Sequence, residues 1–183
     1  MRYARLKHKH WTMREWRCCN HVWQLLLSRL YPERETWQPI CPTCGGTMAD
    51  YTITFDGGSR NNGSPDALGY GSYKVSTAIG RSEIIRLTFP AGTTNNEAEY
   101  KSLIAALEDL MGRIQRANRP VGEFTLQVRG DSALVVNQVQ GTWQTKKEHL
   151  RPLRDRAQAI IALFKQVEFV WQPREDSVQV LGH

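Results

Sequence analysis

The sequence of 183 residues lacks an apolar run long enough to cross a lipid bilayer. The leucine run at residues 25–27 is far shorter than the roughly 20 apolar residues that a membrane helix needs. The basic N-terminus also leads into no apolar segment of signal-peptide length. We therefore expect a cytoplasmic protein that has no membrane partner.

Cysteine is missing from residues 45–183, because all four cysteines lie within the first 44 residues. This distribution excludes a disulfide framework across the protein and indicates that the cysteines form a local site in the N-terminal segment. Two pairs of residues, each with two residues between its members, have the spacing of a tetrahedral zinc site: Cys18, His21, Cys41 and Cys44. Two alternatives stay open, because Cys19 competes with Cys18 and because the thiols can also be reduced and free of metal.

The chain also lacks internal repeats and low-complexity tracts, and its length allows one ordinary domain with a small appendage. We assign residues 1–48 to a basic, tryptophan-rich, zinc-binding module and residues 49–183 to the main domain. The net charge of +6 favours a polyanionic partner, nucleic acid first. Tryptophans interleaved with Arg and Lys in the module suit a nucleic-acid surface, where rings stack and cations neutralise phosphates. The alternative is that these tryptophans pack a small zinc domain.

In the main domain, β-branched residues and alternating apolar positions predict five strands, at 51–56, 67–77, 82–89, 124–129 and 167–172. A helix is expected after the third strand, and two more between the last two strands, the second of them ending near Lys165. Three strands, a helix, a strand, helices and a final strand predict an α/β domain. We expect a mixed sheet of three antiparallel strands followed by two parallel ones, flanked by helices.

The helix after the third strand begins with a capping box, because Thr94 is followed three residues later by Glu97. Apolar residues at three- and four-residue steps then mark one buried stripe. Glu99 lies on the same face of the helix as Leu103, whereas Glu97 lies roughly on the opposite face. A buried carboxylate is costly without a cation beside it, so Glu99 is a candidate metal ligand. The alternative is a side chain that reaches past the rim of the first turn into water.

Two further acidic residues, Asp56 and Asp131, follow apolar strand residues. Sites in α/β sheets form at the carboxyl ends of strands, so adjacent parallel packing would bring both side chains to Glu99. Singly, Asp56 is also suited to a turn and Asp131 to a helix N-cap. Clustered carboxylates favour Mg²⁺ or Mn²⁺, and two such ions can activate water for attack on a phosphodiester.

Three stretches, FDGGSRNN at 55–62, TTNNEAEYKSLIAAL at 93–107 and GDSALVVNQVQGTWQ at 130–144, resemble the ribonuclease H family of the compact prokaryotic type. The resemblance implies a ribonuclease H-like fold and two metal ions held by Asp56, Glu99 and Asp131. It also implies that Asn95 and Asn96 reach the RNA strand through 2′-hydroxyls, although helix capping is an alternative role. Further positions would approach the substrate backbone: Gly58, Ser59, Ser132 and Gln138.

The chain departs from the family near residue 181. After Pro-Arg-Glu the family has a helix with a fourth metal-binding Asp, but the gapless position here is Leu181. A shift of two residues aligns His183 with that Asp and makes it a candidate catalytic residue, and Asp176 is the other candidate. The resemblance therefore leaves the fourth ligand open.

The resemblance implies a metal-dependent endonuclease that hydrolyses the RNA strand of RNA–DNA hybrids. We expect a monomer without a small-molecule cofactor. Basic residues could follow the hybrid's phosphates, or merely form a solvated helix face: Lys146, Lys147, Arg151 and Arg154. The alternatives for function are a hybrid-binding protein that does not cleave, because the fourth Asp is missing, and a resolvase-like DNA nuclease of the same superfold.

Overall fold

The computed structural model describes residues 13–18, 21–26, 49–77 and 82–182. The chain divides into two compact units, residues 1–48 and residues 49–183. In the first unit, β1 (Met13–Cys18) and β2 (His21–Leu26) pair antiparallel, with Cys18 opposite His21. Of the predicted zinc ligands, Cys41 and Cys44 lie outside the described residues, so the zinc site stays a prediction.

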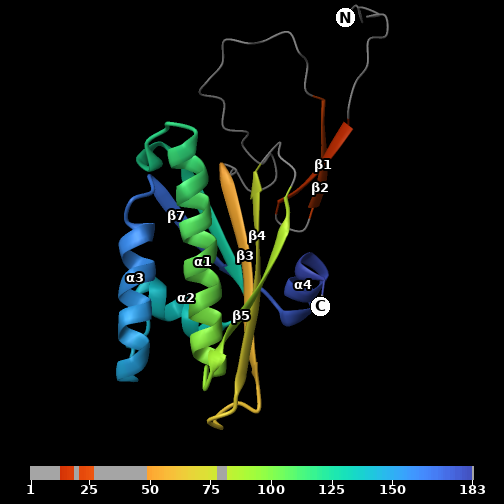
Figure 1. Ribbon diagram of the computed structural model, residues 1–183. Helices are drawn as coiled ribbons and strands as arrows, with labels where there is room; N and C mark the ends of the chain where they lie inside the picture. Colours follow the sequence, from red (N-terminus) through yellow and green to blue (C-terminus); the bar gives the residue numbers. More distant parts are fainter. Residues whose placement is uncertain (1–12, 19–20, 27–48, 78–81, 183) are drawn as a thin grey trace, which may run out of the picture. The chain divides into compact units, whose positions relative to one another are not determined.

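The second unit is built on a mixed sheet of five strands in the order β5-β4-β3-β6-β7 (Figure 1). The strands are β3 (Tyr51–Arg60), β4 (Leu68–Thr77), β5 (Ile84–Ala91), β6 (Thr125–Gly130) and β7 (Gln166–Trp171). β4 is antiparallel to both β3 and β5, whereas β3, β6 and β7 are parallel neighbours. The predicted sheet of three antiparallel and two parallel strands is confirmed.

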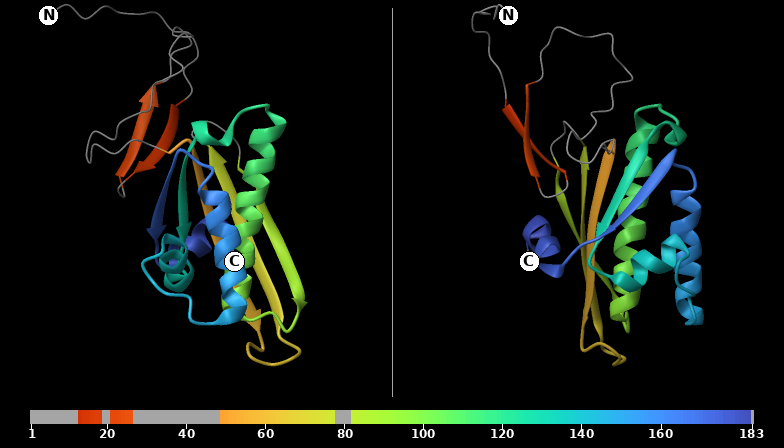
Figure 2. Two further views of the ribbon diagram at one scale, coloured as in Figure 1. Left: turned by 90° about the vertical axis from the view of Figure 1, so that its left-hand side faces the viewer. Right: turned by 180° about the vertical axis from the view of Figure 1, so that it is seen from behind.

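Four α-helices accompany this sheet in the described residues: α1 (Asn95–Arg116), α2 (Ala133–Gln140), α3 (Arg151–Ile161) and α4 (Arg174–Leu181). Short 3₁₀ turns occur at Val121–Glu123 and Glu148–Leu150. α1, α2 and α3 cover one face of the sheet, and α4 lies on the other face (Figure 2). Among the described residues, none of the helices combines the length and apolar character that crossing a membrane requires.

The core lies between the sheet and α1. Ile53 and Phe55 of β3 are fully buried with Tyr100, Leu103 and Leu107 of α1. β3 also buries the alternate residues Thr54 and Asp56, so it is covered on both faces at its centre. A run buried on both faces is typical of a central strand in an α/β sheet.

Gly57 lets the start of α1 approach this central strand. A Cβ atom at Gly57 would lie 2.4 Å from the backbone nitrogen of Glu99, a distance that no packed side chain tolerates. The strand also continues through Gly57 to Arg60, beyond the turn that the sequence predicts after Asp56. Glycine here is therefore needed for the close contact between β3 and α1, and this contact carries Glu99 to the sheet.

Candidate metal site

Asp56 and Asp131 are brought together by the parallel pairing of β3 and β6. Phe55 pairs with Gly130 in this ladder, and each aspartate is the next residue along its chain. The carboxyl ends of adjacent parallel strands meet at one edge of the sheet, which places both side chains there. Asp56 is 2% exposed, and Asp131 is half-buried.

Glu99 reaches the same place from α1. The capping box is present, because Glu97 Oε2 accepts hydrogen bonds from Thr94 N at 2.8 Å and Thr94 Oγ1 at 2.7 Å, and Glu97 N donates back to Thr94 Oγ1 at 3.4 Å. Two residues further on, Glu99 faces inward and is 5% exposed. Glu97 thus fixes the start of the helix, and Glu99 is held against the sheet.

The three carboxylates form a cluster, called here the acid cluster: Asp56, Glu99 and Asp131. One oxygen from each lies within 4.8 Å of the others. Burial raises the pKa of Glu99 to about 9, and the charges of Asp131 and Asp56 add to this rise. Arg174 and a backbone hydrogen bond from Gly57 act in the opposite direction.

The acid cluster fits a divalent metal ion. Glu99 Oε2 is buried and accepts no hydrogen bond from the described residues. A carboxylate oxygen is therefore left to coordinate a metal ion near the other two carboxylates. Three carboxylates are hard oxygen donors, which suit Mg²⁺ and Mn²⁺ better than softer metals. A cation would also offset the burial and the charge repulsion that together raise the pKa of Glu99.

Two residues beside the acid cluster have no role in the interpretation of the sequence. Trp171, at the end of β7, donates from Nε1 to the backbone oxygen of Asp131 at 3.0 Å although its ring is 55% exposed. Arg174 begins α4 and is the cation that opposes the raised pKa of Glu99. The contact from Trp171 depends on the pairing of β7 with β6. The effect of Arg174 on Glu99 depends on the packing of α4. The sequence marks Arg174 only as part of the Pro-Arg-Glu stretch, and it offers no signal for Trp171.

The predicted substrate residues surround the acid cluster in different ways. Ser59 Oγ donates to Thr93 O at 2.8 Å, and Asn95 is exposed with its backbone nitrogen on Asn62 Oδ1 at 2.9 Å. Asn96 is half-buried. A Cβ at Gly58 would lie 2.5 Å from Tyr70 Oη, so the exposed Tyr70 ring covers this glycine.

The two predicted residues on α2 also have structural bonds. Ser132 is the N-cap of α2, where its side chain accepts a hydrogen bond from Val135 N at 3.4 Å. Gln138 is 7% exposed, and both ends of its amide bond within the protein. A role of Gln138 at the substrate backbone stays a prediction.

The candidate fourth ligands lie outside the acid cluster or outside the described residues. Asp176 is exposed in the first turn of α4 and does not belong to the cluster. Leu181 is fully buried, and its backbone oxygen accepts a hydrogen bond from Arg86 Nη2 at 3.4 Å. His183 lies outside the described residues. Within the described part of the chain, three carboxylates make up the site.

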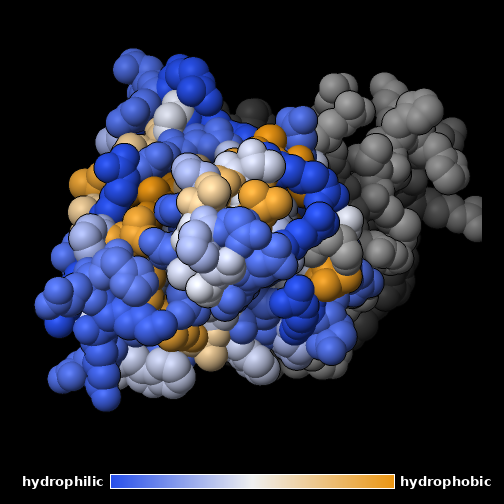
Figure 3. All heavy atoms as spheres, turned by 60° about the horizontal axis from the view of Figure 1, so that its bottom comes forward, coloured by the Kyte–Doolittle hydropathy of each residue, from blue (hydrophilic) through white to orange (hydrophobic). Residues whose placement is uncertain are grey.

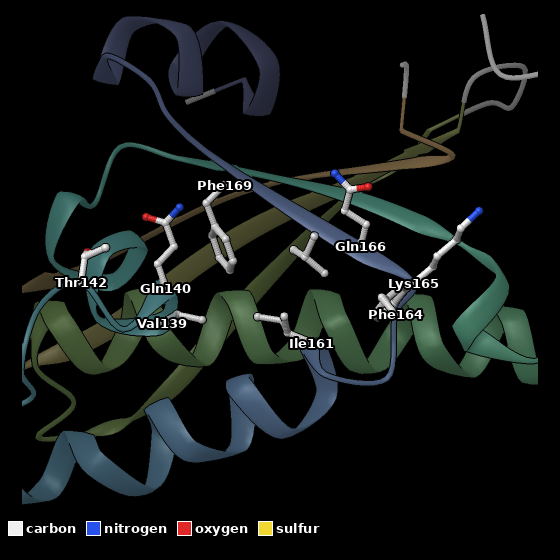
Figure 4. Close-up of a pocket in the computed structure, with 9 residues that line it drawn as sticks. Val139, Gln140, Thr142, Ile161, Phe164, Lys165, Gln166 and Phe169 are labelled. Carbon is white, nitrogen blue, oxygen red and sulfur yellow. The ribbon is translucent and has the colours of Figure 1, made fainter. Parts of the chain in front are cut away.

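The face of the molecule seen in Figure 3 is largely hydrophilic. Small apolar areas are scattered among its polar side chains. A separate groove lies between β7 and the ends of α2 and α3, lined by Val139, Phe164 and Phe169 among others (Figure 4). None of the described candidate residues lines this groove. This groove is therefore not part of the candidate metal site.

Comparison with known proteins identifies the family of the chain. A family model described as reverse transcriptase-like matches residues 83–180. The bifunctional protein Rv2228c of Mycobacterium tuberculosis is 37% identical over 123 residues, 67% of this chain and 31% of that protein. Ribonuclease HI of Halobacterium salinarum is 36% identical over 138 residues, 74% of this chain and 61% of that protein. The chain therefore spans less than two thirds of either relative.

A solved structure with the same fold contains nucleic acid. The crystal structure of LC11-RNase H1 in complex with an RNA/DNA hybrid matches with a TM-score of 0.61 and 28% sequence identity. The match covers 70% of this chain and 89% of that one. The similarity therefore extends over almost the whole of that neighbour.

Proposed function

The chain belongs to the reverse transcriptase-like family of ribonuclease H-like domains, and from this membership we propose that it hydrolyses the RNA strand of RNA–DNA hybrids. The observation that carries the proposal is the acid cluster. Three carboxylates converge where the parallel pairing of β3 with β6 ends. A fold neighbour that is solved with a hybrid supports the choice of substrate.

Asp56, Glu99 and Asp131 would hold two Mg²⁺ or Mn²⁺ ions. Such ions, when bound, activate water and stabilise the leaving oxygen of a phosphodiester. Glu99 has to give up its proton to become a ligand, because its pKa of about 9 keeps it protonated at neutral pH in the metal-free protein. Metal binding should therefore release a proton and strengthen as pH rises.

Recognition of the RNA strand is assigned to the residues at the start of α1. The exposed Asn95 and half-buried Asn96 carry amides that both donate and accept hydrogen bonds. Amides can pair with 2′-hydroxyls, the groups that distinguish RNA from DNA. Gly58, Ser59 and Ser132 lie along the chain beside the cluster residues, which supports a role near the substrate backbone.

Phosphates of the hybrid are assigned to basic residues that follow α2. Lys146 and Lys147 are exposed, and Arg151 begins α3 with an exposed side chain. Arg154, farther along α3, forms an ion pair with the neighbouring Asp155 at 2.6 Å. We therefore expect Arg154 to contribute less to phosphate binding. Phosphate contacts of this kind contribute affinity that weakens as salt is raised.

The test is cleavage of a hybrid with label on the RNA strand, with Mg²⁺ or Mn²⁺ added. We expect metal-dependent cleavage of the RNA strand that Asp131→Asn abolishes, with single-stranded RNA and branched DNA left intact. Cleavage of branched DNA in place of the hybrid would contradict the substrate. Cleavage that persists in Asp131→Asn would contradict the site.

A second candidate function is hybrid binding without cleavage. The observation that favours it is Leu181, a fully buried leucine at the gapless position of the family's fourth aspartate. Three carboxylates remain, so we expect slower cleavage and not its loss. Tight binding of the hybrid together with no detectable cleavage in either metal would select the binding protein.

The N-terminal module is assigned a structural zinc ion, held by Cys18, His21, Cys41 and Cys44, and a role in raising affinity for the hybrid. Support comes from the spacing of the ligands and from the mixture of basic and aromatic residues. Metal analysis of the whole purified protein tests this assignment. We expect about one zinc per chain, and its loss in Cys41→Ser; a zinc-free wild-type protein would contradict it.

A further inference from the structure

Residues 142–147, called here the basic segment, connect α2 to the 3₁₀ turn before α3 without forming a helix or strand. The segment presents Lys146 and Lys147 to solvent, and the Trp143 ring is 51% exposed. A segment without regular backbone hydrogen bonds has to be held by other groups if its side chains are to meet a substrate at fixed positions.

Backbone and side-chain groups of the neighbouring helices hold the backbone of the basic segment. At its start, Thr142 N and Trp143 N both donate to Asn137 O, at 3.0 and 3.1 Å. In the middle, Gln138 Nε2 donates to Gln144 O at 3.2 Å. Arg151 Nε donates to Thr145 O at 3.2 Å. The contact from Gln138 is the one that comes from a buried side chain.

Gln138 is in turn oriented by the core of the domain. The Tyr100 hydroxyl donates to Gln138 Oε1 at 2.8 Å, and Tyr100 is fully buried. An amide oxygen can only accept hydrogen bonds, so this bond turns the amide nitrogen toward Gln144 O. Without the hydroxyl, a reversed amide would place an acceptor against the carbonyl of Gln144, where no hydrogen bond can form.

We propose that Tyr100 and Gln138 are positioning residues that fix the basic segment relative to the acid cluster. Tyr100 follows Glu99 directly in α1, so one helix carries both a cluster carboxylate and the anchor of the segment. The hydrogen-bonded chain from Tyr100 through Gln138 to Gln144 O crosses from α1 to α2 and ends on the segment. The distance between the reacting phosphodiester and the phosphates held by Lys146 and Lys147 is set by this chain.

Substrate positioning rests on the proposed function, but the anchoring itself can be measured without any nuclease activity. Tyr100→Phe removes only the hydroxyl, and Tyr73→Phe is the matched control. Tyr73 is 6% exposed, also packs in the core, and donates to Asp109 Oδ2 at 3.2 Å, a contact that does not involve the basic segment. Both variants lose one tyrosine hydroxyl that is hydrogen-bonded within the domain.

Amide hydrogen exchange over residues 142–147 is the first readout. We expect exchange in Tyr100→Phe to be about three- to tenfold faster, as the loss of one net hydrogen bond implies, and Tyr73→Phe to match the wild type. Gln138→Met keeps the length of the side chain without its hydrogen bonds and should show the same acceleration. The double variant should show no more than either single change. Unchanged exchange in Tyr100→Phe would overturn the proposal.

Hybrid cleavage is the second readout. In Tyr100→Phe we expect KM for the hybrid to rise about three- to tenfold with kcat within about twofold, because phosphate contacts and not the acid cluster are displaced. In a Lys146→Ala/Lys147→Ala background the same change should leave KM unaltered. A fall in kcat, or a rise in KM that persists in that background, would overturn the positioning role. A wild-type protein that neither binds nor cleaves the hybrid would overturn the proposed function, while the exchange contrast would still decide whether the anchor exists.

Discussion

The starts of α1 and α4 show how differently two acidic helix ends can be used. α1 has a side-chain N-cap with a complete capping box, and it buries Glu99 against β3. α4 starts after Pro173 without a side-chain cap, and its acidic residues, Glu175 and Asp176, are exposed. The helix start that is fixed by a capping box is therefore the one that buries its carboxylate against the sheet. Residue type alone does not decide it.

Gly57→Ala should have the largest effect, because it disturbs the start of α1. The added Cβ would meet the backbone of Ala98 and Glu99, so the start of α1 has to move away from β3. A displacement near 1 Å at a reacting centre can lower the rate by about a hundredfold, and we expect that loss in hybrid cleavage. Overpacking should also lower the free energy of unfolding by about 1–3 kcal/mol. Cleavage kinetics and chemical denaturation measure the two effects, and normal cleavage would show that the close contact is dispensable.

Glu99→Gln should stabilise the metal-free protein while removing a ligand. The pKa of Glu99 is raised from its ordinary value to about 9 in the folded protein, so the folded state holds the proton more tightly than the unfolded state. The contribution of Glu99 to stability is therefore greatest below pH 4.5 and is lost as pH rises toward 9. At pH 7, about 2.5 pH units above the ordinary pKa of 4.5, we expect Glu99→Gln to be about 3 kcal/mol more stable than the metal-free wild type.

Denaturant unfolding in the presence of a chelator, at several pH values, measures this difference. The gap between Glu99→Gln and the wild type should close at acidic pH, and Mg²⁺ should stabilise the wild type more than the variant. Equal stabilities of the variant and the wild type across the pH range would contradict a buried Glu99 with a raised pKa. Glu97→Gln is the matched control and should show no such dependence on metal.

Glu97→Gln should weaken the helix start without harming the chemistry. A glutamine can still fill the capping box, but it loses the charge that accepts from Thr94 N and Thr94 Oγ1. We expect about 0.5–1 kcal/mol of lost stability. Thermal unfolding measures the loss, and a hybrid-cleavage rate within about twofold of the wild type shows that the acid cluster is intact.

Asp176→Asn should have the smallest effect of the four changes. Asp176 is exposed and does not belong to the acid cluster, although the sequence makes it a candidate fourth ligand. We expect a stability change within about 0.5 kcal/mol and an unaltered Mg²⁺ dependence of cleavage. A shift of that Mg²⁺ dependence to higher concentration would give the start of α4 a share in metal binding and erase the contrast with α1.

The acid cluster is a part of the molecule that local sequence patterns describe well. Helical periodicity marks Glu99 as inward-facing, and the capping box separates it from Glu97. The aspartates follow recognisable strands, and parallel pairing of those strands is the natural outcome of a helical crossover. Residue spacing is therefore enough to mark the three candidate carboxylates, whereas their convergence depends on the pairing of β3 with β6.

Contacts that depend on tertiary packing could not be predicted. The strand that carries Asp56 continues past the predicted turn, because Gly57 and Gly58 pair with Gly71 and Tyr70 of β4. The indole of Trp171 bonds the backbone of Asp131 only once β7 has aligned beside β6.

Gln138 also depends on tertiary packing. Its polar side chain suggests a position on the surface, but its amide oxygen accepts a hydrogen bond from the buried Tyr100 hydroxyl. Long-range partners of this kind leave no periodic trace in the sequence. Packing therefore supplies the supports of the site, while local pattern supplies its ligands.

The most direct test of the account compares Glu99→Gln with Glu97→Gln in cleavage of an RNA–DNA hybrid at saturating Mg²⁺. The two glutamates lie in the same helical turn and differ chiefly in burial and in contact with the cluster aspartates. We predict that Glu99→Gln lowers kcat at least about a hundredfold, which corresponds to about 2.7 kcal/mol, and that Glu97→Gln stays within about twofold of the wild type. Equal losses in the two variants, or full activity in Glu99→Gln, would contradict a metal site built on the start of α1.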